Sequence, residues 1–117
     1  MTETKRDATS GSPAGPREVE AYVFLNEYNF RVEPGFAVAN RGDVLVIENF
    51  TRSELVVTFP AVIREQPLRV GTGKPEKVPL GENLPYGFYP YTVSVEIGGG
   101  QKLEALGGSG PGVIIRR

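Results

Sequence analysis

The stretch ENLPYGFYPYTVSVEIGGG, residues 82–100, holds the longest run of alternating side chains in this chain. Between residues 87 and 97 one set of alternate positions is apolar or aromatic, and the intervening set is mostly polar. The first set is Tyr89, Tyr91, Val93, Val95 and Ile97, and the second is Pro90, Thr92, Ser94 and Glu96. Successive side chains of a β-strand point to opposite faces of a sheet. The pattern therefore predicts a strand with one buried face, which turns back at the glycines 98–100.

The same period of two continues in shorter segments from Glu18 to the C-terminus, and helical spacing is nowhere sustained. Gly, Pro, Asn and Asp separate these segments, as expected for turns between antiparallel strands with one buried face. The predicted strands are 18–25, 28–33, 43–49, 54–59, 75–80, 87–97, 101–106 and 112–116. Seven or eight short strands at this spacing predict an all-β fold, a Greek-key β-sandwich.

The length of 117 residues fits one domain. Residues 1–17 contain no aliphatic side chain larger than Ala after Met1 and are rich in Ser, Thr, Gly and Pro. Such a segment buries too little surface to offset the entropy of ordering it. We therefore expect a flexible N-terminal tail over residues 1–17 and a β-sandwich domain over residues 18–117.

The composition argues against several classes of function. Thirteen basic against fourteen acidic residues give a formal charge of −1, so nucleic acid is not an expected partner. The chain has no Cys and no His, which removes thiolate chemistry and the usual proton shuttle near neutral pH. No apolar run approaches the roughly 20 residues that span a bilayer, and no signal peptide is evident. We expect no membrane insertion, and the sequence leaves the compartment unknown.

Four segments in order resemble the cupredoxin family over roughly residues 28–117. They are RVEPGFAVANRGDVLVIENFT (31–51), ELVVTFP (54–60), PYGFYPYTV (85–93) and PGVIIRR (111–117). In that family a Pro-Gly turn ends an extended segment, a Gly-Asp turn feeds a strand ending in Asn, and a Gly-x-Tyr-x-aromatic strand leads into the copper ligands. The resemblance implies a cupredoxin-like sandwich, and it favours an extracytoplasmic location over the cytoplasm, which would be the default.

The ligands of a blue-copper site are nevertheless missing. Such a site needs two imidazoles and a thiolate, usually with a weak axial Met. The resemblance puts Glu54 at or next to the first His and Val93 at the Cys, and the later His and Met would fall within 94–111, which has neither. The only Met is Met1. We therefore expect no cofactor and no metal site, with Val93 packed in the core and a hairpin in place of the ligand loop.

Four aromatic residues around this strand have different expected roles. Tyr89 resembles the tyrosine-corner residue of Greek-key sandwiches, whose hydroxyl bonds backbone, and Tyr91 is expected in the core. Tyr86 and Phe88 have the opposite parity, which leaves them for contact with a partner at the surface. That partner is another protein, or alternatively a glycan or a Pro-rich peptide.

Catalysis is not expected, because Ser, Thr and Lys have no recognisable activating partner. The carboxylates of Asp43, Glu48, Glu54 and Glu82 are spread over different turns and strand ends. The tripeptide Arg41-Gly42-Asp43 is better explained as turn chemistry than as an integrin motif. We expect a copper-free cupredoxin-like domain that acts as a binding or structural module, without electron transfer. The alternatives are a relative that handles a metal through carboxylates and a carbohydrate-binding or adhesion sandwich.

Overall fold

The chain is all-β in the computed structural model, which describes residues 16–26, 29–98, 101–104 and 110–117. Within these residues there are eleven strands and no helix. The strands are β2 (Glu18–Asn26), β3 (Asn29–Glu33), β4 (Phe36–Ala39), β5 (Val44–Asn49), β6 (Leu55–Thr58), β7 (Leu68–Val70), β8 (Glu76–Pro79), β9 (Gly87–Pro90), β10 (Thr92–Gly98), β11 (Gln101–Glu104) and β12 (Gly112–Ile115).

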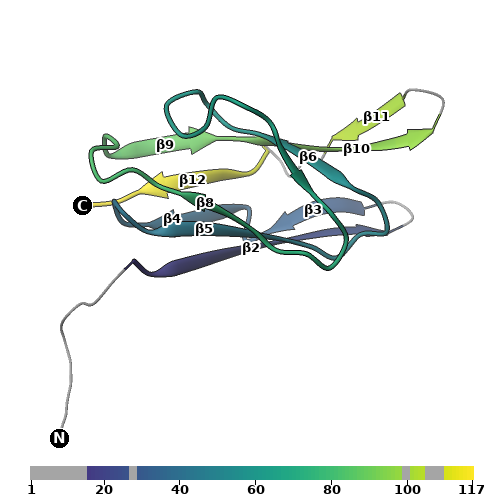
Figure 1. Ribbon diagram of the computed structural model, residues 1–117, viewed down its shortest axis with the longest axis horizontal. Helices are drawn as coiled ribbons and strands as arrows, with labels where there is room; N and C mark the ends of the chain where they lie inside the picture. The colour runs from purple at the N-terminus through teal and green to yellow at the C-terminus, as the bar shows by residue number, and fades with distance from the viewer. Residues whose placement is uncertain (1–15, 27–28, 99–100, 105–109) are drawn as a thin grey trace, which may run out of the picture.

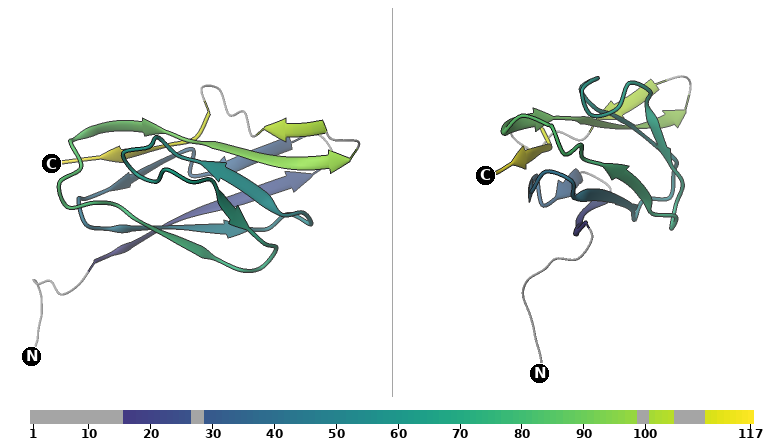
Figure 2. Two further views of the ribbon diagram at one scale, coloured as in Figure 1. Left: turned by 45° about the horizontal axis from the view of Figure 1, so that its top comes forward. Right: turned by 60° about the vertical axis from the view of Figure 1, so that its left-hand side comes forward.

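The strands form three sheets that together make a β-sandwich-like fold. Their orders are β3-β2-β5-β8, β11-β10-β6-β7 and β4-β12-β9. In Figure 1 the sheet containing β10 and β6 lies above the sheet containing β2 and β5. The three-stranded sheet lies toward the end with the C-terminus, and both views in Figure 2 keep β9 and β12 side by side there. The chain passes repeatedly between the sheets. For example, β3 and β4 belong to different sheets, and so do β9 and β10.

The strand count exceeds the predicted seven or eight for two reasons. β4 has four residues and β7 has three, too few for alternation to identify either as a strand, and both were missed. In addition, the long predicted strand is divided at Tyr91, whose amide donates to the Pro111 carbonyl at 3.1 Å, so that β9 pairs with β12 and β10 with β6. Pro90, which cannot donate to a ladder, lies on β9 at an edge of its sheet, as the sequence predicted.

The expectation of antiparallel pairing was wrong for two strand pairs. β2 pairs with β5 in parallel, and β12 pairs with β4 in parallel. Period-two alternation defines which face of a strand is buried, but it carries no information on the direction of the neighbouring strand. The remaining pairs among the described strands are antiparallel.

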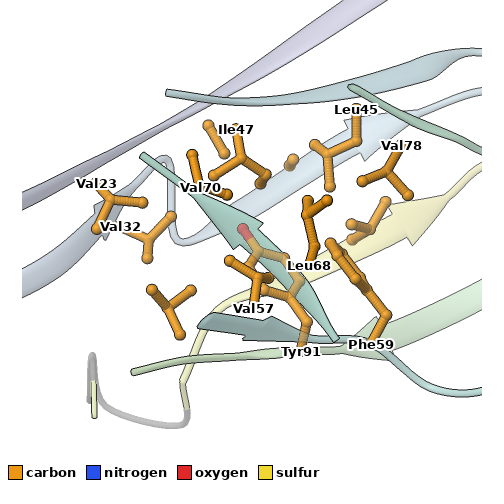
Figure 3. Packing of buried hydrophobic residues seen from close by; sticks show 14 of the residues in the cluster. Val23, Val32, Leu45, Ile47, Val57, Phe59, Leu68, Val70, Val78 and Tyr91 are labelled. Atoms are coloured by element: carbon orange, nitrogen blue, oxygen red, sulfur yellow. The ribbon is translucent and has the colours of Figure 1, made fainter. Parts of the chain in front are cut away.

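The core lies between the layers and is almost entirely aliphatic. Figure 3 shows Val23, Leu45, Ile47, Val57 and Val70, which come from four strands, directed toward one another. The aromatic part of the core consists of Phe30, Phe59 and Tyr91, and the ring centroids of Phe59 and Tyr91 are 5.1 Å apart. Burial of these side chains is the main favourable term for the fold.

The hairpin predicted in place of a ligand loop is present. β10 and β11 pair antiparallel, with Val95 opposite Leu103, at the end of the molecule far from the C-terminus (Figure 1). Its predicted turn at 98–100 lies partly outside the described residues. Ser94 departs from the predicted pattern because it is buried. It is small enough to lie between its cross-strand neighbours on β6 and β11, and its hydroxyl donates to the Val56 carbonyl at 3.4 Å.

Candidate functional site

The three-stranded sheet presents large apolar side chains on its solvent-facing side. The register places Phe36 and Val38 of β4 opposite Gly112 and Ile114 of β12. The same two β12 residues lie opposite Pro90 and Phe88 of β9. We call this surface, with the residues that border it, the aromatic–arginine face: Phe36, Val38, Arg41, Tyr86, Phe88, Pro90, Ile114, Arg116 and Arg117.

Two aromatic side chains of this sheet, Phe36 and Phe88, contact each other across β12. Phe88 crosses β12 and meets Phe36 edge to face, with ring centroids 5.3 Å apart. Gly112 makes this possible, because a Cβ there would overlap the Phe88 ring. The exposed fractions are 47% for Phe36 and 48% for Phe88. Each ring is therefore held by the sheet and still offers about half of its surface.

One end of the face is basic. The guanidinium carbon of Arg41 lies 3.8 Å from the centroid of the Tyr86 ring, and that of Arg117 lies 5.3 Å from it. Arg41 also donates from Nε to the Leu84 carbonyl at 2.7 Å. Cation–π contact of this kind favours a fixed guanidinium orientation. Tyr86 thus positions two arginine side chains at the edge of the apolar surface.

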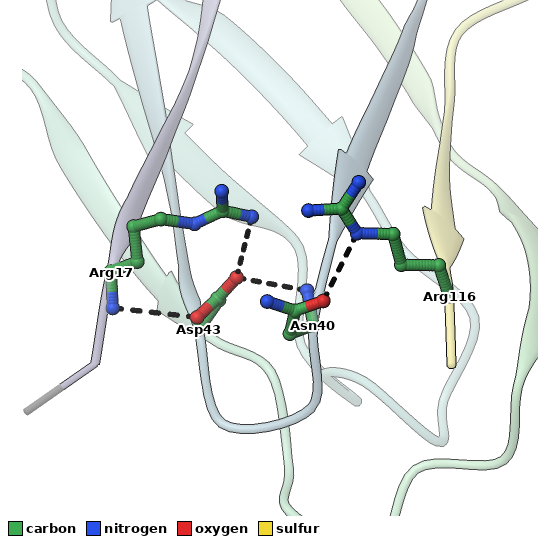
Figure 4. Close-up of polar contacts among 4 residues, drawn as sticks. All are labelled: Arg17, Asn40, Asp43 and Arg116. Carbon is green, nitrogen blue, oxygen red and sulfur yellow. Dashed lines mark hydrogen bonds and ion pairs between the residues drawn. The ribbon is translucent and has the colours of Figure 1, made fainter. Parts of the chain in front are cut away.

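The turn that carries Arg41 is fixed by Asp43, which is buried. Figure 4 shows its carboxylate accepting from the Asn40 amide at 2.8 Å and from both the amide and the guanidinium of Arg17. Asn40 in turn accepts from Arg116 Nε at 3.1 Å. Gly42 has φ 81°, a conformation that favours glycine. Gly42 and Asp43 of the Arg-Gly-Asp tripeptide therefore form the turn, as turn chemistry predicted, while the Arg41 side chain is exposed.

The arginines of the face differ from other cations of the chain in their partners. The ion pairs between described residues join Arg17 to Asp43, Arg31 to Glu33, Arg69 to Glu54 and Lys77 to Glu18. Within the part of the chain that the structure describes, no carboxylate pairs with Arg41, Arg116 or Arg117. Neutral oxygens and the Tyr86 ring hold these three, and no carboxylate of the described residues forms an ion pair with them.

The two remaining tyrosines of the strand have the predicted places. The Tyr89 hydroxyl donates to the Pro85 carbonyl four residues upstream, the bond expected of a tyrosine corner. Tyr91 is buried in the core, and burial raises the pKa of its phenol. Its hydroxyl makes no hydrogen bond within the described residues.

The positions at which the resemblance places copper ligands hold side chains with other roles. Val93 is fully buried, as predicted. Glu54 is exposed, and its carboxylate pairs with Arg69 at 3.0 Å. The loop before Glu54 is closed by Asn49, whose amide donates to the carbonyls of Ser53 and Val70. The side chain of Asn49 is therefore buried within the fold.

The fold does not gather the carboxylates of Asp43, Glu48, Glu54 and Glu82 into one site. Among residues 16–26, 29–98, 101–104 and 110–117, no group of three or more acidic side chains could hold a metal ion. Glu48 instead lies near Glu20 on the outer side of the β2–β5 pair. Partial desolvation raises the pKa of Glu48, and a hydrogen bond with Glu20 raises it further. The Tyr22 hydroxyl also donates to Glu20, which raises the pKa of Tyr22.

A second aromatic group lies beside these carboxylates. The rings of Phe24 and Phe50 stack with centroids 5.3 Å apart, and Tyr22 is 5.8 Å from Phe50. A shallow pocket of about 140 Å³ lies next to it, lined by Glu48, Asn49, Phe50, Gly73 and Pro75. Phe24 is covered on one side by the Arg31 guanidinium.

The sequence predicted two members of the aromatic–arginine face and missed the others. Tyr86 and Phe88 are both exposed, as expected from their parity. Phe36 and Val38 were missed because β4 is so short. Their signal was the alternation Phe-Ala-Val-Ala, in which the smaller residues Ala37 and Ala39 are buried and the larger ones face solvent.

None of the described residues forms a helix that could cross a membrane. No family model matches the sequence, and no curated protein matches it.

Proposed function

We propose that this chain is a copper-free, cupredoxin-like Greek-key domain that acts as a protein-binding module, without electron transfer or catalysis. The observation that carries the binding role is the aromatic–arginine face. Monomeric proteins seldom expose contiguous apolar surface of this kind unless it serves an interaction. Aromatic and Arg side chains are also the residues enriched at protein interfaces.

The copper-free part of the proposal is supported by the pairing of β6 and β10. The resemblance places ligands at Glu54 and at Val93. Val93 lies on β10, and Glu54 directly precedes the neighbouring strand β6, where Leu55 is opposite Val95. One position holds a buried aliphatic side chain and the other a surface ion pair. The strand that would carry the thiolate is thereby used for packing.

Copper titration tests this part. Addition of Cu(II) or Cu(I) followed by oxidation is expected to leave the protein without the intense blue absorption of a Cu–thiolate site. Appearance of that absorption would refute the proposal.

The binding role is tested by selection against the face. The full chain is immobilised and panned with a phage-displayed library of random short peptides, and each enriched peptide is measured against variants. Phe36→Ser and Phe88→Ser are expected to weaken binding by roughly tenfold or more, the loss typical of a truncated interface anchor. Phe50→Ser is the matched control, since Phe50 is also exposed but lies in the other aromatic group.

Circular dichroism and thermal unfolding of each variant separate a lost contact from a lost fold. Phe36→Ser is less disruptive to the fold than Phe88→Ser, because the Phe88 ring packs over Gly112 of β12. If Phe50→Ser weakens the enriched peptides as much as Phe36→Ser does, the face is not the binding surface.

A further inference from the structure

We propose that the aromatic–arginine face binds an acidic protein segment, in which a carboxylate side chain lies next to apolar side chains. This inference rests on the proposed binding role of the face and adds the chemistry of its partner. It follows from the division of the face into an apolar part and a basic part.

The apolar part would take the hydrophobic side chains of the segment. Its two rows are set by the register: Phe36, Gly112 and Pro90 form one, and Val38, Ile114 and Phe88 form the other. Gly112 has no side chain and is crossed by the Phe88 ring, so the rows form a low, nearly continuous surface. Val38 is 42% exposed and Phe88 48%. Covering such surface with apolar groups removes it from water, which is favourable.

The basic part would take the carboxylate. Arg41 and Arg117 both lie within 6 Å of the Tyr86 ring. Arg41 uses Nε on the Leu84 carbonyl, and Arg116 uses Nε on Asn40, so the terminal amino groups of both remain for another acceptor. Two guanidinium groups close to one ring repel each other, and a nearby anion would reduce this repulsion. A carboxylate there would accept charge-assisted hydrogen bonds, roughly twice as strong as neutral ones.

The geometry favours a protein segment over a membrane or a glycan. The rings lie on a sheet face and are half covered, whereas membrane-inserting side chains need to project into the acyl region. Val38, Ile114, Pro90 and the two Phe side chains offer no hydrogen-bonding group for the hydroxyls of a sugar. Charge complementarity selects an acidic partner, because no described carboxylate neutralises the three arginines.

The test uses the peptides enriched by selection, together with versions of them in which the acidic residue is replaced by Lys. The expected enrichment is Asp or Glu beside Leu, Ile, Val or an aromatic residue. Arg41→Glu and Arg117→Glu are expected to weaken the enriched peptides by roughly tenfold or more, and added salt is expected to weaken binding to the parent. Arg52→Glu makes the same charge change at an exposed position in the loop between β5 and β6 and is expected to leave binding unchanged.

Rescue gives the most specific readout. A peptide whose acidic residue is replaced by Lys is expected to bind Arg41→Glu better than it binds the parent. Phe36→Ser and Phe88→Ser separate the two proposals. Peptides that need the Phe residues but are indifferent to Arg41→Glu and Arg117→Glu would overturn the acidic partner while leaving the binding role intact. Absence of any peptide that depends on the Phe residues would overturn both.

A membrane is distinguished by cosedimentation with vesicles of phosphatidylcholine and phosphatidylserine. The expected result is no binding of the full chain. Binding to these vesicles that is lost in both Phe36→Ser and Arg41→Glu would overturn the assignment to a protein segment.

Discussion

Val93 lies directly opposite Val57 across the β10–β6 pair, and both side chains are completely buried. The neighbouring residue, Thr92, is opposite Thr58, and both of these are exposed. One residue of register thus separates the core from the solvent along this strand. The position that the cupredoxin resemblance gives to a copper-binding thiolate is part of the hydrophobic core.

This relationship predicts a large difference between two adjacent substitutions. Val93→Asp would bury an unpaired carboxylate and is expected to lower the free energy of unfolding by roughly 3 kcal/mol or more. Thr92→Asp keeps its charge in solvent and is expected to change stability by no more than about 1 kcal/mol. Denaturant unfolding of both variants beside the parent, with comparison of m-values, checks the prediction. Equal stabilities would mean that the register is wrong.

The N-terminal boundary gives a second prediction. Residues 1–15 lie outside the described residues, and the predicted tail ended at Arg17. Arg17, however, donates to both Asp43 carboxylate oxygens, and its carbonyl accepts from the Val44 amide at 2.9 Å. We expect a chain that begins at Pro16 to unfold at the same temperature as the full chain. A fall of more than about 4 °C, equivalent to about 1 kcal/mol in a domain of this size, would show that residues 1–15 contribute to the fold.

Asp43 provides the contrasting variant. Asp43→Ala removes the acceptor of the Asn40 amide and of Arg17 and is expected to cost about 1–3 kcal/mol, because the turn loses bonds in a buried position. The same variant loosens the turn that carries Arg41, so it is also expected to weaken the peptides that depend on Arg41. Unchanged stability in Asp43→Ala would contradict the role given to this turn.

The sequence predicted the buried faces of the long strands, because apolar and polar residues alternate along a strand that has one buried face. It predicted the places of Tyr89, Tyr91 and Val93 in the same way. It did not predict sheet order or the two parallel pairs, because these depend on contacts between residues far apart in the chain. It also missed β4 and β7, which have four and three residues, because so short an alternation also occurs by chance in loops.

The candidate site was harder to predict for the same physical reason. Tyr86 and Phe88 followed from the parity of one strand. Their neighbours come from β4 and from the end of β12, and only the sheet brings Phe36 and Arg117 to them. The contact of Arg41 with Tyr86 joins a turn to a loop that are more than forty residues apart in sequence.

The carboxylate pair on the opposite sheet predicts a dependence of stability on pH. The pKa of Glu48 is raised by desolvation and by Glu20, so the folded state binds a proton more tightly than the unfolded state. The resulting stabilisation is present below the ordinary Glu pKa and is lost as the pH rises through the raised one. Glu48→Gln, which keeps a neutral side chain here, is expected to raise the unfolding temperature at neutral pH.

The same variant is expected to gain less on acidification from neutral pH to about pH 5 than the parent does. Glu54→Gln is the control, because the exposed Glu54 carboxylate forms an ion pair with a basic residue, Arg69. Thermal unfolding at several pH values gives all three curves. A lower unfolding temperature for Glu48→Gln at neutral pH would contradict the unfavourable placement of the charged Glu48 carboxylate beside Glu20.

Tyr89 and Tyr91, two residues apart, are expected to respond oppositely to loss of the hydroxyl. The Tyr89 hydroxyl donates to the Pro85 carbonyl, and Tyr89→Phe leaves that tyrosine corner without its bond. A cost of about 1 kcal/mol is expected. The Tyr91 hydroxyl is buried, and within the described residues it has no partner, so it has lost its hydration without a compensating bond. Tyr91→Phe keeps the ring contact with Phe59 and is expected to leave stability unchanged or to raise it by up to about 2 kcal/mol.

The measurement is denaturant unfolding of both variants and of the double variant. Because Tyr89 and Tyr91 serve different contacts, the double variant is expected to show the sum of the two effects within about 0.5 kcal/mol. Burial also raises the pKa of Tyr91, so its phenol is expected to stay neutral on alkaline titration until the protein unfolds. A loss of stability in Tyr91→Phe as large as that in Tyr89→Phe would show that the Tyr91 hydroxyl is bonded in solution. In that case the core around Val57 and Leu68 would contain a polar partner for it, and its description as an aliphatic core would be wrong.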